Sequence, residues 1–111
     1  VLGDAVTATL PKVAASVFDG DAGALENAIA DRGIDEFARW SLLQAMVFMT
    51  VEGRVDRGRT EAFLRRFGAE RLARAGEATW AGWEEAVVLL GLADLADAVE
   101  AARQDGRLLE N

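Results

Sequence analysis

Apolar side chains recur along this chain at every third or fourth position, and no alternation of apolar and polar residues persists for more than a few positions. Spacing of this kind predicts amphipathic helices rather than strands. Turns rich in glycine and aspartate, such as residues 19–21 and 105–106, divide the pattern into about six segments. The links between segments are short, which makes neighbouring helices antiparallel. We therefore expect an all-α protein of about six short antiparallel helices.

The first half of the chain contains three of these segments. Asp4 can cap the first segment, in which Pro11 either forms a kink or marks the first turn. Asp21 can cap the second, which ends near Gly33. The third spans residues 35–52, and eleven of the fifteen residues from 37 to 51 are apolar. A helix that is apolar on every side is buried on every side in a globular protein, so we expect this segment to be the central helix.

The second half contains the other three. Asp56 can cap a fourth helix that Gly68 ends, with a short helical turn after it. Thr79 can cap a fifth helix, and a sixth follows Gly91 and closes at residues 105–106. Each of the last three segments carries its own apolar stripe: Thr60, Phe63, Leu64 and Phe67; then Trp80, Trp83, Val87 and Leu90; then Leu92, Leu95, Ala96, Val99 and Ala102.

Two parts of the pattern resemble known families. Residues 35–46 resemble the second helix of HEAT-like repeats, with Asp35, then Arg39 four positions later, and spaced alanine and leucine residues. More broadly, the chain resembles the bacterial domain of unknown function 1186 in a set of turns and core positions: Gly3-Asp4, Gly20-Asp21, Arg39, Glu52-Gly53, Asp56-Arg57 and Trp83. The resemblance implies a HEAT-like α-α superhelix, that is, an α-solenoid segment. It carries over no catalytic residues.

Length and composition agree with a single packed domain over residues 1–111. Members of the resembled family are longer and this chain begins at Val1, so we expect a fragment of a longer protein. Hydrophobic residues make up 51% of the chain, but no apolar run approaches the roughly 20 residues needed to cross a bilayer. The absence of cysteine fits a reducing compartment, and we expect a cytoplasmic protein without a membrane partner.

The residue types that most often perform catalysis are missing. The chain has no histidine, cysteine or tyrosine, which removes the usual acid/base, the thiolate nucleophile and the commonest metal ligands. Paired carboxylates could still hold a cation or perform acid/base chemistry. Glu84 and Glu85, however, are adjacent on a helix and point about 100° apart, so they do not converge on one site. Asp94 and Asp97 share a face, but there they fit the N-terminal end of the sixth helix. We therefore expect no enzyme activity, no cofactor and no metal.

Arg39 and two tryptophans are the candidates for a pocket. Arg39 lies in the most apolar helix, so its charge needs a partner, and we expect a structural ion pair with Asp35. The alternative is a clamp for an anion or a substrate carboxylate. Trp80 and Trp83 share the apolar stripe of the fifth helix and are expected in the core. A second hypothesis for function places these two tryptophans with Arg39 in the pocket of a small enzyme or ligand-binding domain.

Charge is distributed unevenly, although the whole chain has a net charge of −7. Residues 54–74 contain seven arginines and three carboxylates, whereas residues 77–105 contain seven carboxylates and one arginine. A third hypothesis, nucleic-acid binding by the arginines, is disfavoured by the acidic net charge. The arginines that form the predicted interaction surface are Arg57, Arg59, Arg65, Arg66, Arg71 and Arg74. Glu61 can pair with Arg65 one turn later.

These observations favour a helical-repeat scaffold that binds a partner and has no catalysis of its own. Stacked helix pairs generate extended surfaces without reactive groups. The partner is either another protein or the remainder of the same longer chain. The opposite charges of residues 54–74 and 77–105 also make a homodimer possible.

Overall fold

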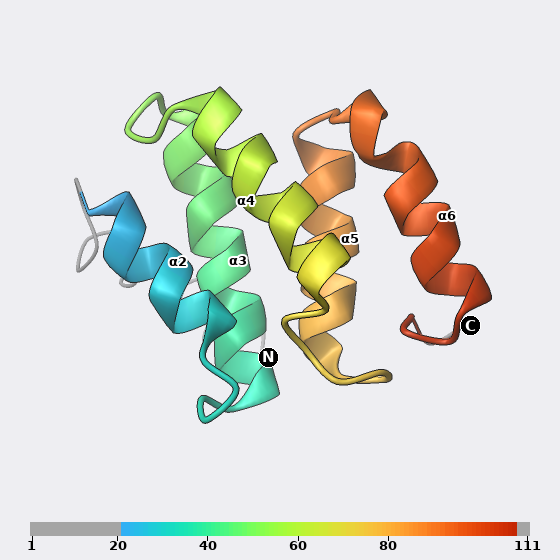
Figure 1. The fold of residues 1–111 in the computed structure, drawn as a ribbon. Coiled ribbons are helices and arrows are strands. Elements are labelled where there is room, and N and C mark those ends of the chain that lie inside the picture. The colour runs from blue at the N-terminus through green and yellow to red at the C-terminus, as the bar shows by residue number, and fades with distance from the viewer. Residues whose placement is uncertain (1–20, 109–111) are drawn as a thin grey trace, which may run out of the picture.

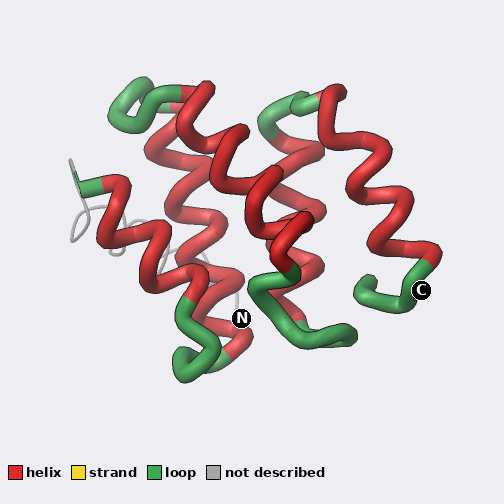
Figure 2. Tube along the Cα trace, in the orientation of Figure 1, coloured by secondary structure: helices red, strands yellow, loops and turns green. Residues whose placement is uncertain are grey.

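The computed structural model describes residues 21–108, which form five α-helices and no strand. The helices are α2 (Ala22–Ala30), α3 (Glu36–Val51), α4 (Arg57–Glu70), α5 (Ala78–Leu89) and α6 (Ala96–Gln104), with a 3₁₀ turn at Ala93–Leu95 before α6 (Figures 1 and 2). The all-α prediction is confirmed. The described part of the chain holds five helices rather than six, and the first predicted helix, with Asp4 and Pro11, lies outside it. No helix of residues 21–108 has the length and apolar character needed to cross a bilayer.

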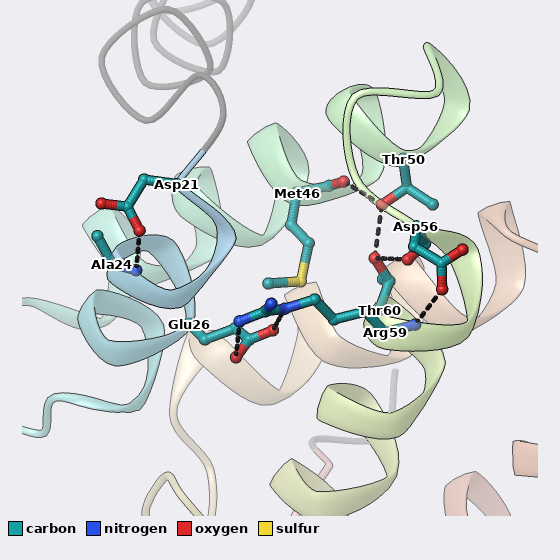
Figure 3. A network of polar contacts seen from close by, with 8 residues as sticks. All are labelled: Asp21, Ala24, Glu26, Met46, Thr50, Asp56, Arg59 and Thr60. Atoms are coloured by element: carbon teal, nitrogen blue, oxygen red, sulfur yellow. Dashed lines mark hydrogen bonds and ion pairs between the residues drawn. The ribbon is translucent and has the colours of Figure 1, made fainter.

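Aspartates begin three of the helices, as the sequence predicts. The Asp21 carboxylate accepts a hydrogen bond from Ala24 N at 2.9 Å, and the Asp56 carboxylate accepts one from Arg59 N at 3.0 Å (Figure 3). Asp35 accepts from Phe37 N at 3.0 Å at the start of α3. Each carboxylate satisfies an amide that has no partner inside its helix.

The predicted cap at Thr79 is wrong. Helix α5 begins earlier, at Ala78, and its N-cap residue Glu77 makes no side-chain capping bond. The amide of Ala78 donates to Glu36 Oε1 of α3 at 3.2 Å, and the Thr79 hydroxyl donates to Glu36 O at 3.3 Å. A neighbouring helix therefore supplies the acceptor that Thr79 was expected to provide.

The predicted end of α4 at Gly68 is also wrong. The helix continues to Glu70 and ends at Arg71, whose φ of 52° is left-handed. A Cβ at Gly68 would lie 2.8 Å from Cζ2 of Trp83, so this position has no room for a side chain. Gly68 therefore allows α4 and α5 to approach each other closely rather than ending the helix.

Helices α3 and α5 lie side by side and run in the same direction. Ala78 contacts Glu36 at one end, and farther along Glu85 Oε1 accepts from the Gln44 amide at 3.2 Å. Helices α2, α4 and α6 run in the opposite direction, with α4 between α2 and α6 (Figure 1). Consecutive helices are therefore antiparallel, as expected from their short links.

The core lies where α3, α4 and α5 meet, and it confirms Trp80 and Trp83 as buried anchors. Both side chains are fully buried, and their rings pack edge to face at 5.3 Å between centroids. Their indole N–H groups donate to Ala73 O at 3.2 Å and Leu64 O at 2.8 Å. Helix α3 is central as predicted, although Phe37 and Val51 at its two ends are exposed.

A buried polar contact also joins α3 to α4. The hydroxyls of Thr50 and Thr60 are 2.7 Å apart, and Thr50 also donates to Met46 O at 2.7 Å (Figure 3). Both threonines lie within the hydrophobic interior, where unsatisfied hydroxyls would be costly. These bonds allow two polar groups to be buried between the helices.

Candidate functional site

Arg39 forms no ion pair with Asp35, so this prediction is wrong. The Asp35 carboxylate caps the amides of α3, while the fully buried Arg39 guanidinium reaches the ends of two other helices. Its Nε donates to Ile29 O at 2.6 Å, in the last turn of α2, and its Nη2 donates to Leu72 O, just beyond α4. Carbonyls at helix C-terminal ends lack partners and carry partial negative charge, so they compensate the cation in place of a carboxylate.

Two more arginines bind carbonyls at the C-terminal end of α4. Arg107 is buried and donates to Gly68 O at 2.7 Å, and Arg32 donates to Arg71 O. We call Arg32, Arg39 and Arg107 the arginine clamp. Burial lowers the pKa of the Arg39 guanidinium below its usual value, and the charge of Glu77 opposes this shift. The role of the clamp is structural, because each of its arginines binds a backbone carbonyl within the chain.

The predicted pocket around Arg39, Trp80 and Trp83 does not form from these residues. All three side chains are fully buried. The Arg39 guanidinium and both indole N–H groups bind backbone carbonyls. None of the three therefore presents an open polar group to a ligand.

The arginines of the predicted interaction surface are not gathered on one face. Arg59 and Arg66 border a hollow on the α2 side of α4, whereas Arg65 borders a hollow on the α6 side. Arg74 is exposed, and the Arg66 guanidinium lies 5.4 Å from the centroid of the Phe63 ring. Four of these arginines form bonds with other residues of the chain: Arg57 with Leu90 O, Arg59 with Glu26 at 2.9 Å, Arg65 with Glu61 at 3.7 Å and Arg71 with Asp105 at 3.1 Å.

The Glu61–Arg65 pair predicted from the sequence is therefore present in the structure. The hydrogen bond that Arg59 donates to the Glu26 carboxylate, shown in Figure 3, raises the pKa of Arg59. Pairing of this kind reduces the charge that residues 54–74 can offer to an outside ligand.

An open apolar groove lies between α5 and α6, with a volume of about 450 Å³. We call it the α5–α6 groove. The residues that line it are Val87, Val88, Gly91, Leu92, Ala93, Ala96, Val99, Glu100 and Arg103. Its volume lies within the range of roughly 300–1,000 Å³ that is usual for ligand sites. The exposed fraction of the Val88 side chain is 66% and that of Leu89 is 62%, so apolar surface continues onto the rim.

The lining residues of α6 have the spacing of a helix-packing surface. Ala96, Val99, Glu100 and Arg103 stand at i, i+3, i+4 and i+7 and face the groove together. The stripe spans about 10 Å, or two turns of helix. Such a stripe on one helix, opposite a second antiparallel helix, is the surface against which a third helix packs.

The structure already contains a filled site of the same kind. Helices α3 and α4 are a consecutive antiparallel pair, and α5 packs against both. A Cβ at Gly82 of α5 would lie 2.5 Å from Cδ1 of Trp40 in α3, and Trp83 of α5 bonds to Leu64 O of α4. Helices α5 and α6 are the next consecutive pair. No helix of residues 21–108 occupies the groove between them.

The sequence did not single out this groove. Val87, Val99 and Ala96 belong to predicted apolar stripes, and all were expected to face the core. Val88 and Leu89 follow directly after Val87 and widen that stripe, and this extra width was the available signal.

Within the part of the chain that the structure describes, no group of three or more His, Cys, Asp or Glu residues is placed to hold a metal ion. Comparisons of the chain with protein-family models, with curated proteins and with solved structures found no match. The resemblance to the domain of unknown function 1186 therefore stays a prediction.

Proposed function

We propose that this chain is a helical-repeat module that binds a partner protein. A helix of the partner would lie in the α5–α6 groove. The observation that carries the proposal is the groove itself, with its apolar floor and the i, i+3, i+4, i+7 stripe of α6. Helix-in-groove recognition uses this geometry, in which an amphipathic helix lays its apolar face between two others.

The packing order supports a HEAT-like arrangement as part of the proposal. Alternate helices are parallel (Figure 1). Helix α5 packs against the pair α3 and α4, and a bound helix would pack against the pair α5 and α6 in the same way. Repeats of this kind expose an uncovered face where a stack is not continued. The function that we propose is binding without catalysis, since the chain has no histidine, cysteine or tyrosine.

The test is titration with a fluorescein-labelled helical peptide of about four turns, with leucines at i, i+3, i+4 and i+7 and glutamine elsewhere. We expect saturable binding, measured by anisotropy. Ala96 lines the groove and is exposed, so Ala96→Trp fills the groove without disturbing the core and should weaken binding at least about tenfold, or about 1.4 kcal/mol.

The matched control is Ala101→Trp, at an exposed alanine on the other side of the same helix. It should bind the peptide like the unmodified protein. Absence of binding at about 1 mM protein would refute the proposal. So would binding that Ala96→Trp leaves unchanged.

A further inference from the structure

The two helices that form the α5–α6 groove are acidic. They carry four carboxylates and one arginine, which are Glu84, Glu85, Asp97, Glu100 and Arg103. The arginine offsets one of these charges, that of Glu84, whose Oε2 accepts from Arg103 Nε at 2.9 Å across one end of the groove. At the other end, the guanidinium of Arg57 is bound to Leu90 O. Both guanidiniums are therefore hydrogen-bonded within the chain, and Arg57 keeps its charge because a carbonyl is a neutral acceptor.

One carboxylate that lines the groove has no cation, and a second lies on α5 beyond the lining residues. Glu100 lines the groove and accepts only from the Gln104 amide, at 3.3 Å. Glu85, one turn before Val88 on α5, accepts only from the Gln44 amide, at 3.2 Å. Neither glutamate forms an ion pair with any residue from 21 to 108. The apolar floor is thus bordered by an unpaired carboxylate on α6.

We infer that the partner helix is amphipathic and basic, with lysine or arginine beside its apolar stripe. This inference rests on the proposed function and adds the chemical class of the partner. Cations beside the stripe would meet Glu100 on α6, while the stripe covers Val88 and Val99. Opposite charge at the edge of an apolar contact selects partners and accelerates their association.

The experiment compares three peptides that share the leucine stripe and differ only in their flanking residues, which are lysine, glutamine or glutamate. The lysine peptide should bind about threefold to tenfold more tightly than the glutamine peptide, and the glutamate peptide should bind most weakly. Raising NaCl from about 50 mM to about 500 mM should reduce this preference, because salt screens exposed charges.

Charge reversal at two positions of α6 separates local from overall charge. Glu100→Lys should remove or invert the preference for the lysine peptide. Asp97→Lys changes the net charge equally, but Asp97 borders the hollow on the α4 side of α6, so the preference should persist. Equal effects of the two variants would overturn the inference, because they would assign the preference to the net charge of the protein.

The remaining outcomes separate this inference from the proposed function. Tight binding of all three peptides with equal affinity would overturn the basic partner and leave helix docking intact. Absence of binding by any peptide would overturn both. A protein dimer, seen by light scattering, that the peptides or Ala96→Trp dissociate would also overturn the inference, because a second copy of the chain would then occupy the groove.

Discussion

Replacement of Arg39 by methionine tests whether the arginine clamp holds the helices together. Arg39→Met removes two hydrogen bonds from a charged donor and leaves Ile29 O and Leu72 O without it. Each such bond contributes about 1.5–3 kcal/mol, so the gross loss is about 3–6 kcal/mol. Methionine recovers part of this loss because no charge is then buried. We expect the free energy of unfolding to fall by about 2–4 kcal/mol.

Urea unfolding followed by tryptophan fluorescence measures this loss, because Trp80 and Trp83 report on the core. A domain of this size has a total stability of about 5–15 kcal/mol, so the variant should still fold. Arg39→Lys retains the charge but has a single nitrogen in place of the forked guanidinium. Its free energy of unfolding should lie between those of the unmodified protein and Arg39→Met.

The matched control is Arg65→Met, which removes an exposed arginine from a helix. Its pair with Glu61 is 3.7 Å long, and exposed pairs of this kind contribute about 0.3–0.5 kcal/mol. If Arg39→Met costs no more than Arg65→Met, the reasoning about carbonyl binding is refuted. A gain in stability would show that the buried charge is a net cost.

Two further predictions concern packing and pH. Gly82→Ala should destabilise the protein by about 1–3 kcal/mol in thermal unfolding, because its Cβ would lie 2.5 Å from Cδ1 of Trp40. The control Gly23→Ala meets nothing closer than 3.5 Å and should be stabilising by about 0.4–1 kcal/mol, so equal shifts would contradict the packing argument. A hydrogen bond from Arg107 lowers the pKa of Asp105 below its usual 3.8, so its stabilisation is complete above that value and is lost as pH falls through the lowered pKa. Asp105→Asn should therefore be less stable than the unmodified protein at neutral pH, and it should lose less stability than that protein between about pH 5 and pH 2. Identical slopes of Tm against pH for the two proteins would refute this prediction.

Local signals in the sequence predicted where two of the helices begin and which side chains of α5 are buried. The starts of α2 and α4 were expected at Asp21 and Asp56, because a carboxylate that caps a helix acts within three residues of itself. The apolar stripe of α5 placed Trp80 and Trp83 in the core, because residues three positions apart share one face of a helix. These features depend on residues that are close together in the chain.

The features that sequence reasoning missed depend on residues that are far apart. The Arg39 guanidinium binds carbonyls ten and 33 residues away, whereas the sequence offered only Asp35 as a nearby partner. The start of α5 depends on Glu36, 42 residues before Ala78. The α5–α6 groove likewise follows from where α6 lies beside α5. Helical spacing alone gives no information on these distances.

The arginine clamp also bears on how such a chain can change by duplication or deletion of helices. The donor of Arg39 lies on α3, while its acceptors belong to the ends of α2 and α4, and Arg107 reaches α4 from beyond α6. A duplication that copied α4 and α5 alone would copy carbonyls without the guanidiniums that bind them. A deletion of the same pair would leave Arg39 and Arg107 buried without their acceptors on α4. The smallest unit that can be gained or lost intact is therefore larger than one helical hairpin.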